Sequence, residues 1–161
     1  MEAAIDHLAF RRACARFATG ITVATALDRD GAPHGMTVNS FASVSLDPPL
    51  VLISVDHSSV MLDLFRDSGR YGISVLSHSQ RDLSQRFAER GQDRFNGTPW
   101  VPGQTGVPLL PDALAHFECE IRNIVNAGDH AILIAEVVAL NAQEGTPVVF
   151  FDSGYRRLEG E

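Results

Sequence analysis

The stretch GMTVNSFASVSLDPP, residues 35 to 49, indicates the class of the fold, because its side chains alternate as they do in a β-strand. Alternation places Thr37, Asn39, Ser43 and Ser45 on one face and Met36, Val38, Ala42, Val44 and Leu46 on the other. Nothing from Gly35 to Leu46 is charged, although a strand face that meets water is usually polar and charged. Small hydroxyl and amide groups therefore favour a strand whose polar face meets a ligand or another subunit.

The segments around this stretch also predict strands. Residues 21–27 (ITVATAL) are rich in β-branched side chains and are followed by turn formers, which predicts a hairpin with the opening stretch. Asp47-Pro48-Pro49 must break the ladder because proline has no N–H to donate, and a buried strand is expected over 50–55. Further strands are predicted over residues 71–76, 114–125, 131–140 and 146–151, with a hairpin turn at NAGDH, residues 126–130.

Few helices are predicted between these strands. Residues 5–18 carry apolar side chains at helical spacing with arginines on the other side, so an amphipathic helix is expected there. A short helix should begin after Ser58 or Ser59 and end at Gly69, and a second should cover 79–90. Residues 91–111 hold four glycines and four prolines and predict a long loop. Because the strands do not alternate regularly with helices, a mainly antiparallel β-barrel with flanking helices is favoured over a parallel doubly wound sheet.

Composition narrows the class of protein. A length of 161 residues predicts one domain over 1–161, and the net charge of −7 argues against a nucleic-acid-binding surface. No apolar run approaches the roughly 18 residues that cross a bilayer, and the first residues do not resemble a signal peptide, so we expect a cytoplasmic protein without membrane contact. The two cysteines are expected to be unpaired thiols, and the ungrouped histidines predict no metal site.

The common catalytic motifs are missing from the sequence. Neither a G-x-G-x-x-G nor a G-x-x-x-x-G-K-[ST] loop is present, and there is no G-x-S-x-G nucleophile elbow or H-E-x-x-H metal helix. If the protein is an enzyme, a cofactor is therefore expected to carry the chemistry.

Several polar residues are candidates for a binding site, each with a plainer alternative. Residues 54–59 (SVDHSS) leave a strand and enter a helix, which suits a phosphate but equally suits an ordinary serine N-cap. Arg86 could add positive charge there or be solvated. His130 in the Gly-Asp-His turn could bind a nucleotide or face water, and Tyr155 could contact a flat ring or only pack.

Four stretches in this order resemble the short-chain flavin reductase family, the NAD(P)H-dependent reductases of two-component flavin monooxygenases. They are FATGITVATA (17–26), HGMTVNSFASVSLDPPLVLISV (34–55), AGDH (127–130) followed by an apolar strand, and FFDSGYRRL (150–158). The resemblance covers about residues 10 to 158. It implies a split β-barrel that dimerises, binds FMN or FAD near the subunit interface, takes hydride from NADH or NADPH, and supplies reduced flavin to a separate monooxygenase.

The resemblance also implies roles for particular residues. The flavin ring would lie along Thr37, Val38, Asn39 and Ser40, continued by Ser54, Val55 and Asp56. The flavin phosphate would lie nearest Ser58, Ser59 and Arg86, with Phe87 packing beside them. The nicotinamide side would be formed by His130 with Ser153, Gly154 and Tyr155. Hydride transfer needs no proton-transfer residue, so His130 is expected to orient the nicotinamide rather than act as a base.

Other functions stay open on the sequence alone. The same barrel also serves pyridoxamine-phosphate oxidase-like proteins, which keep FMN bound and pass electrons to oxygen, and it could serve as a non-enzymatic flavin- or haem-binding module. Asp56-His57 brings no lysine or arginine next to the expected phosphate, and the choice between FMN and FAD is undecided.

Overall fold

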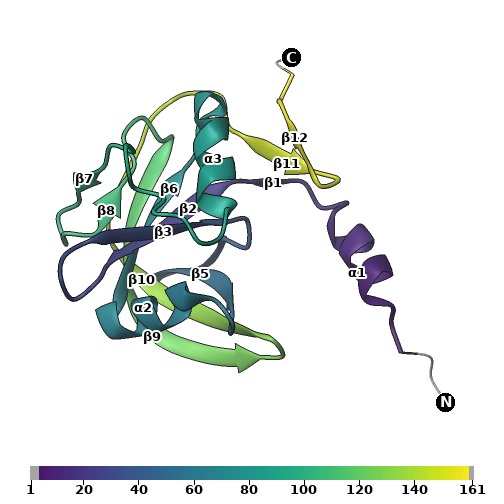
Figure 1. Ribbon diagram of the computed structural model, residues 1–161, viewed down its shortest axis with the longest axis horizontal. Helices are drawn as coiled ribbons and strands as arrows, with labels where there is room; N and C mark the ends of the chain where they lie inside the picture. The colour runs from purple at the N-terminus through teal and green to yellow at the C-terminus, as the bar shows by residue number, and fades with distance from the viewer. Residues whose placement is uncertain (1–3, 160–161) are drawn as a thin grey trace.

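Seven strands form one sheet in the structure, a computed structural model that describes residues 4–159 (Figure 1). They are β2 (Thr22–Leu27), β3 (Pro33–Val38), β4 (Ala42–Leu46), β5 (Pro49–Asp56), β6 (Arg70–Val75), β9 (Ala115–Ala127) and β10 (His130–Ala142). Every neighbouring pair is antiparallel, in the order β3-β2-β6-β9-β10-β5-β4. The predicted mainly antiparallel β fold is confirmed, although the hydrogen-bonded sheet does not close into a ring. The first three and last two residues of the predicted domain lie outside the described part.

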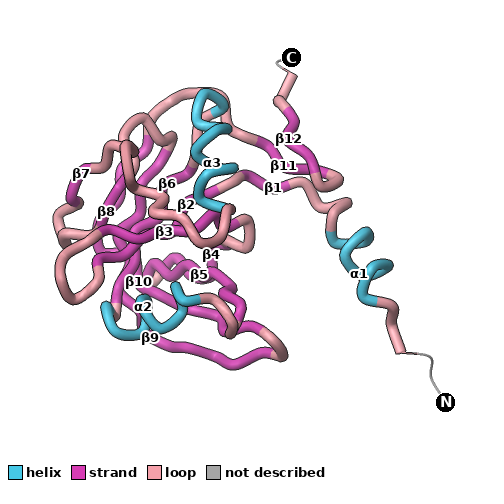
Figure 2. Tube along the Cα trace, in the orientation of Figure 1, coloured by secondary structure: helices cyan, strands magenta, loops and turns pink. Residues whose placement is uncertain are grey.

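The stretch 35–46 is two strands rather than the single strand that its alternation predicts. It leaves β3 after Val38 and re-enters the sheet as β4 at Ala42, and these strands are the two opposite edges (Figure 2). Four residues of chain span at most about 14 Å, so the sheet must curl until its edges nearly meet. Ser40 fixes this crossing, because its Oγ accepts from the Ser54 backbone N–H at 2.9 Å and donates to the Ser54 carbonyl at 3.2 Å.

The predicted hairpins are present. β2 pairs with β3 from Thr22↔Val38 to Leu27↔Pro33, and β4 turns into β5 at Asp47-Pro48. β9 and β10 form a long hairpin that turns at Gly128 and Asp129, with two irregularities in register along its length. Three of the six pairings in the sheet, β2–β3, β4–β5 and β9–β10, therefore join strands adjacent in the chain, and the pairings β2–β6, β6–β9 and β5–β10 join strands farther apart.

Helices cover the sheet at two places. α2 (Val60–Ser68) begins at the Ser59 N-cap and ends at Gly69, which adopts a left-handed conformation. A 3-10 turn, η1 (His78–Gln80), leads into α3 (Arg81–Ala88), which lies against β3. Gly35 allows this approach, since a Cβ at that position would lie 2.9 Å from the Phe87 ring. One buried core lies between the sheet and α2, and a second surrounds Phe87.

The segment 91–111 is folded against the body. It contains a short pair, β7 (Val101–Pro102) with β8 (Pro108–Leu109), and the Arg94 guanidinium donates to the Gly35 carbonyl at 2.5 Å. Phe95 packs edge-on against Phe87 at a centroid distance of 5.0 Å. The expected long loop is therefore part of the wall that holds α3 in place.

The C-terminal segment adds a hairpin of which sequence patterns predict only the first strand. β11 (Val149–Phe151) pairs with β12 (Gly154–Arg156) and with β1 (Thr19–Gly20), forming a separate three-stranded sheet. Asp152 and Ser153 make the two-residue turn with positive φ angles of 51° and 59°, the conformation that twisted hairpins favour.

Helix α1 (His7–Cys14) is shorter than the expected helix over 5–18, and none of its residues is buried. It lies outside the seven-stranded sheet, beside the three-stranded one (Figure 1). Leu8 and Phe10 expose 54% and 60% of their surface. No helix within residues 4–159 is long and apolar enough to cross a bilayer.

Candidate functional site

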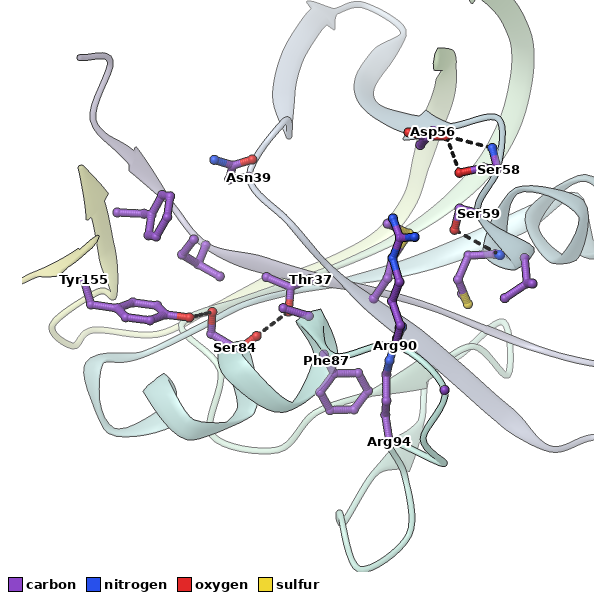
Figure 3. Close-up of a pocket in the computed structure, with 17 residues that line it drawn as sticks. Thr37, Asn39, Asp56, Ser58, Ser59, Ser84, Phe87, Arg90, Arg94 and Tyr155 are labelled. Atoms are coloured by element: carbon purple, nitrogen blue, oxygen red, sulfur yellow. Dashed lines mark hydrogen bonds between the residues drawn. The ribbon is translucent and has the colours of Figure 1, made fainter. Parts of the chain in front are cut away.

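A cavity of about 490 Å³ opens where β3, the start of α2, α3 and the C-terminal hairpin meet (Figure 3). This volume falls within the range of about 300–1,000 Å³ that is usual for small-molecule sites. Its apolar wall comes from Ile21, Met36, Met61, Phe87 and Phe150. Hydroxyl, amide, carboxylate and guanidinium groups from several elements complete the lining, so the cavity combines an apolar wall with polar groups.

Seven of the sequence-predicted residues line this cavity. They are Thr37, Asn39, Asp56, Ser58, Ser59, Phe87 and Tyr155. These residues come from β3, the end of β5, the cap of α2, α3 and β12. The fold therefore brings together residues that are up to 118 positions apart in the chain, counting from Thr37 to Tyr155.

Other predicted residues lie elsewhere. Val38 and Val55 are buried in the core and do not line the cavity. Ser40 and Ser54 hydrogen-bond to each other. Arg86 donates from Nε to the Arg94 carbonyl at 2.8 Å and from Nη2 to the Asn96 carbonyl. Its guanidinium therefore binds the 91–111 segment. Ser153 lies in the hairpin turn, Gly154 begins β12, and neither lines the cavity.

His130 lines a second hollow of about 840 Å³ between α1 and the β9–β10 hairpin. Leu8 and Phe10 of α1 and Ser54 of β5 share that hollow. The structure thus separates His130 from Tyr155, which the resemblance groups on one side of the site. The link between the two hollows is the strand pair β5–β10, in which His130 lies opposite Asp56.

Carboxylates flank His130 at this junction. His130 Nδ1 lies 2.7 Å from Asp129 Oδ1, and this hydrogen bond, with the charge of His130, lowers the Asp129 pKa. Asp56 Oδ1 accepts from the Ser58 hydroxyl and from the Ser58 backbone N–H, each at 2.7 Å. Those bonds are the main reason that the pKa of Asp56 is lowered, with smaller contributions from the charges of His130 and Arg90.

Sequence reasoning missed Arg90, Arg94 and Ser84, which also line the cavity. Arg90 lies just beyond the end of α3, after the extended residue Glu89, and no hydrogen bond or ion pair of its guanidinium occurs within residues 4–159. Arg94 is half-buried, and burial is the main reason that its pKa is lowered. The spacing of Arg90 from Arg86 could have marked it, whereas the position of Arg94 depends on the path of the 91–111 segment.

Ser84 joins two sides of the cavity (Figure 3). Its backbone carbonyl accepts from Thr37 Oγ1 at 2.6 Å, and its hydroxyl lies 2.8 Å from the Tyr155 hydroxyl. Because the Thr37 proton points at that carbonyl, Thr37 presents acceptor lone pairs to the cavity. The site thus offers neutral polar groups in fixed orientations beside the apolar wall.

Residues 14–159 match the Flavin reductase like domain family, which is most of the chain. The chain belongs to this flavin reductase family. The family resemblance of the four sequence stretches is thereby confirmed.

Individual relatives extend this result. A probable flavin reductase of Rhizobium meliloti (strain 1021) is 47% identical over 97% of this chain, and this chain spans 51% of that relative's length. The styrene monooxygenase flavin reductase of Pseudomonas putida S12 has a TM-score of 0.88 and 42% identity over 94% of this chain and 98% of its own. The Streptomyces globisporus C-1027 NADH:FAD oxidoreductase SgcE6, solved in complex with NAD and FAD fragments, has a TM-score of 0.91 and 37% identity, covering 96% and 93%.

Proposed function

We propose that this flavin reductase domain, over residues 1–161, transfers hydride from NADH or NADPH to FMN or FAD and supplies reduced flavin to a separate monooxygenase. The observation that carries the proposal is the cavity itself, in which an apolar wall faces neutral hydroxyl and amide groups. The likeness to the styrene monooxygenase flavin reductase and to the NADH:FAD oxidoreductase supports the same activity and the same kind of partner.

The residues present fit a flavin. Met36, Met61 and Phe150 offer polarisable surface for a planar ring, and Asn39 offers both a donor and an acceptor to its polar edge. At the α2 end, Ser58, Ser59 and Arg90 line the cavity, the charge of Arg90 acts on Asp56 next to Ser58, and the Arg90 guanidinium has no partner within residues 4–159. We assign the flavin phosphate to this end, with Arg90 in the role that the resemblance gave to Arg86.

When both are bound, the flavin accepts a hydride from the reduced nicotinamide and so carries the redox chemistry. The chain's own part is to bind and orient the two molecules and to keep water from them. Phe150 and Tyr155 cover one side of the cavity, and Thr37 holds its hydroxyl in one orientation through Ser84. A site of mostly neutral groups suits a flavin that must leave after reduction, with affinity near micromolar, or about −8 kcal/mol.

His130 is proposed to orient the nicotinamide. Its ring is held by Asp129 and lies across the sheet from Asp56, which lines the flavin cavity. A neutral or charged imidazole at this place can donate a hydrogen bond to a carboxamide without taking part in hydride transfer.

A homodimer is proposed as the working assembly. The apolar side chains of α1 are exposed beside the His130 hollow, and burying them against a second copy would remove apolar surface from water.

A cytoplasmic location is also proposed. The two thiols, Cys14 and Cys119, are unpaired, which supports this location.

The experiment that tests the function follows the NADH absorbance band after FMN, FAD or riboflavin is added separately to the purified protein. We expect NADH consumption that depends on added flavin, and the flavin that gives the highest kcat/KM defines the preference. Absence of oxidation with all three flavins and with both NADH and NADPH would refute the proposal. NADH oxidation by protein that keeps its flavin through gel filtration would instead favour the oxidase-like alternative. Flavin binding without NADH oxidation would favour a non-enzymatic module.

A further inference from the structure

The C-terminal hairpin β11–β12 forms one wall of the flavin cavity through Phe150 and Tyr155. β11 is anchored to the body by its pairing with β1, and the Asp152 backbone N–H donates to the Ala15 carbonyl at 2.9 Å. β12 is the outer strand and pairs only with β11 among the described residues. Its position against the cavity must therefore come from its side chains.

Tyr155 makes the side-chain contacts that hold β12 in place. Its hydroxyl lies 2.8 Å from Ser84 Oγ, the Arg81 guanidinium lies 4.8 Å from its ring centroid, and Phe150 packs edge-on at 5.6 Å. The first two contacts come from α3, whereas Phe150 belongs to the hairpin itself. The Tyr155 ring also packs against the buried cluster around Phe87, so the polar part of the attachment of β12 comes from two residues of α3.

Ser84 provides the hydrogen bond in this attachment. It is fully buried, and a buried helical serine commonly bonds a carbonyl of its own helix. Within residues 4–159 its hydroxyl bonds Tyr155 instead, while its carbonyl is occupied by Thr37. The same residue thus touches β3 on one side of the cavity and the hairpin on the other.

We propose that Ser84 is a positioning residue that latches the β11–β12 hairpin against the flavin cavity through the Tyr155 hydroxyl. The effect on ligand binding rests on the proposed flavin reductase function, whereas the latch itself does not. With the latch closed, Phe150 and Tyr155 complete the cavity wall before a ligand arrives. With it broken, the hairpin keeps its β1 pairing and β12 opens more often.

Trypsin tests the latch without any ligand, because Arg156 lies in β12 next to Tyr155. Cleavage after Arg156 requires local opening, and its rate follows the population of the open form when opening is fast. Loss of one hydrogen bond should raise that population about five-fold. We expect this increase in Ser84→Ala and in Tyr155→Phe, and no further increase in the double variant. Ser79→Ala, which removes an exposed hydroxyl near the start of α3, is the matched control and should cleave at the wild-type rate.

Flavin binding provides the second measurement. In both single variants the flavin dissociation constant should rise about five-fold, and the double variant should resemble either single one. Equal cleavage rates in wild type and Ser84→Ala, or additive effects in the double variant, would overturn the latch. A wild-type protein that binds no flavin but shows the cleavage pattern would refute the proposed function and leave the latch supported.

Discussion

Arg86 lies in the last turn of α3 and Arg90 lies just beyond the end of this helix, and the structure gives them different surroundings. Arg90 faces the cavity near Ser58 and Ser59, whereas Arg86 is hydrogen-bonded to loop carbonyls. We predict that Arg90→Gln weakens FMN binding about five- to ten-fold, because it removes a cation near the phosphate, and leaves riboflavin binding unchanged. Fluorescence titration of each flavin measures both constants.

Arg86→Gln is the comparison for that variant. It should affect FMN and riboflavin alike, since its guanidinium supports the 91–111 segment and not the ligand. A phosphate-specific loss in Arg86→Gln with none in Arg90→Gln would restore the role that the sequence resemblance suggests for Arg86.

His130 should affect the nicotinamide and not the flavin. We predict that His130→Ala raises the KM for NADH or slows flavin reduction several-fold, because the imidazole no longer orients the carboxamide, while the flavin dissociation constant is unchanged. Steady-state and stopped-flow kinetics measure the two steps. Kinetics identical to those of the wild type would remove His130 from the site.

The sequence identified residues of the site wherever one short segment carries them. Thr37, Asn39, Ser58 and Ser59 lie in or beside strand ends whose patterns are readable, and all four line the cavity. Arg94 could not be found in this way, because its place depends on how a loop of about twenty residues packs on β3. Val38 was expected beside the flavin ring from the resemblance alone, and its side chain lies in the core, so that contact stays a prediction.

At the scale of elements, the Glu118 carboxylate holds the turn between β7 and β8. Its Oε1 accepts from the Gln104 N–H at 2.9 Å, and its Oε2 accepts from the Thr105 N–H and hydroxyl, each at 2.6 Å, so it ties the β7–β8 turn to β9. Burial by itself would raise the Glu118 pKa, but these hydrogen bonds outweigh it and lower the pKa below the ordinary value of 4.5. We predict that Glu118→Gln lowers the free energy of unfolding by about 1–3 kcal/mol at neutral pH, because one amide nitrogen then faces backbone donors.

The stabilisation by Glu118 should depend on pH. Since the folded-state pKa is depressed, the stabilisation is complete above about 4.5 and is lost as the pH falls through the folded-state value. Urea unfolding at neutral pH and below about 4.5 gives the free energy of unfolding of both proteins. The gap in this free energy between wild type and Glu118→Gln should narrow on acidification. Glu144→Gln, at an exposed position, should show no gap. A gap that is constant with pH would contradict the assignment to the ionised carboxylate.

At the level of elements, periodicity predicted where strands lie but not that the opening stretch is two strands. The alternation is out of phase at Ser40 and Phe41, between β3 and β4. Two such residues can be read as a local irregularity, and only the pairing of β3 with β2 and of β4 with β5 shows that the chain crosses between edges. Strand β12 was missed for a related reason. Three residues are too few to show a period, and the turn at Asp152 and Ser153 uses positive φ angles at non-glycine positions.

At the scale of the whole molecule, α1 marks the limit of what a sequence pattern can say. An amphipathic pattern predicts that a helix buries one face, but it does not state which surface covers that face. Here no residue of α1 is buried within the protomer, and its apolar side chains lie beside the hollow that contains His130. We therefore expect a surface outside the protomer to cover the apolar side of α1, which is the basis of the proposed homodimer.

Phe10 offers a direct test of that assembly, because its side chain is 60% exposed on α1 and lines the His130 hollow. We predict that Phe10→Asp shifts the wild-type dimer toward monomer by ten-fold or more in dissociation constant, since burying an aromatic side chain contributes about 1.5–3 kcal/mol and an unpaired carboxylate opposes burial. Sedimentation velocity over a range of concentrations measures this shift. Arg12→Gln, a polar substitution on the same helix, should leave the dimer intact. A wild-type monomer at all concentrations, or a dimer unaffected by Phe10→Asp, would show that α1 does not form the interface.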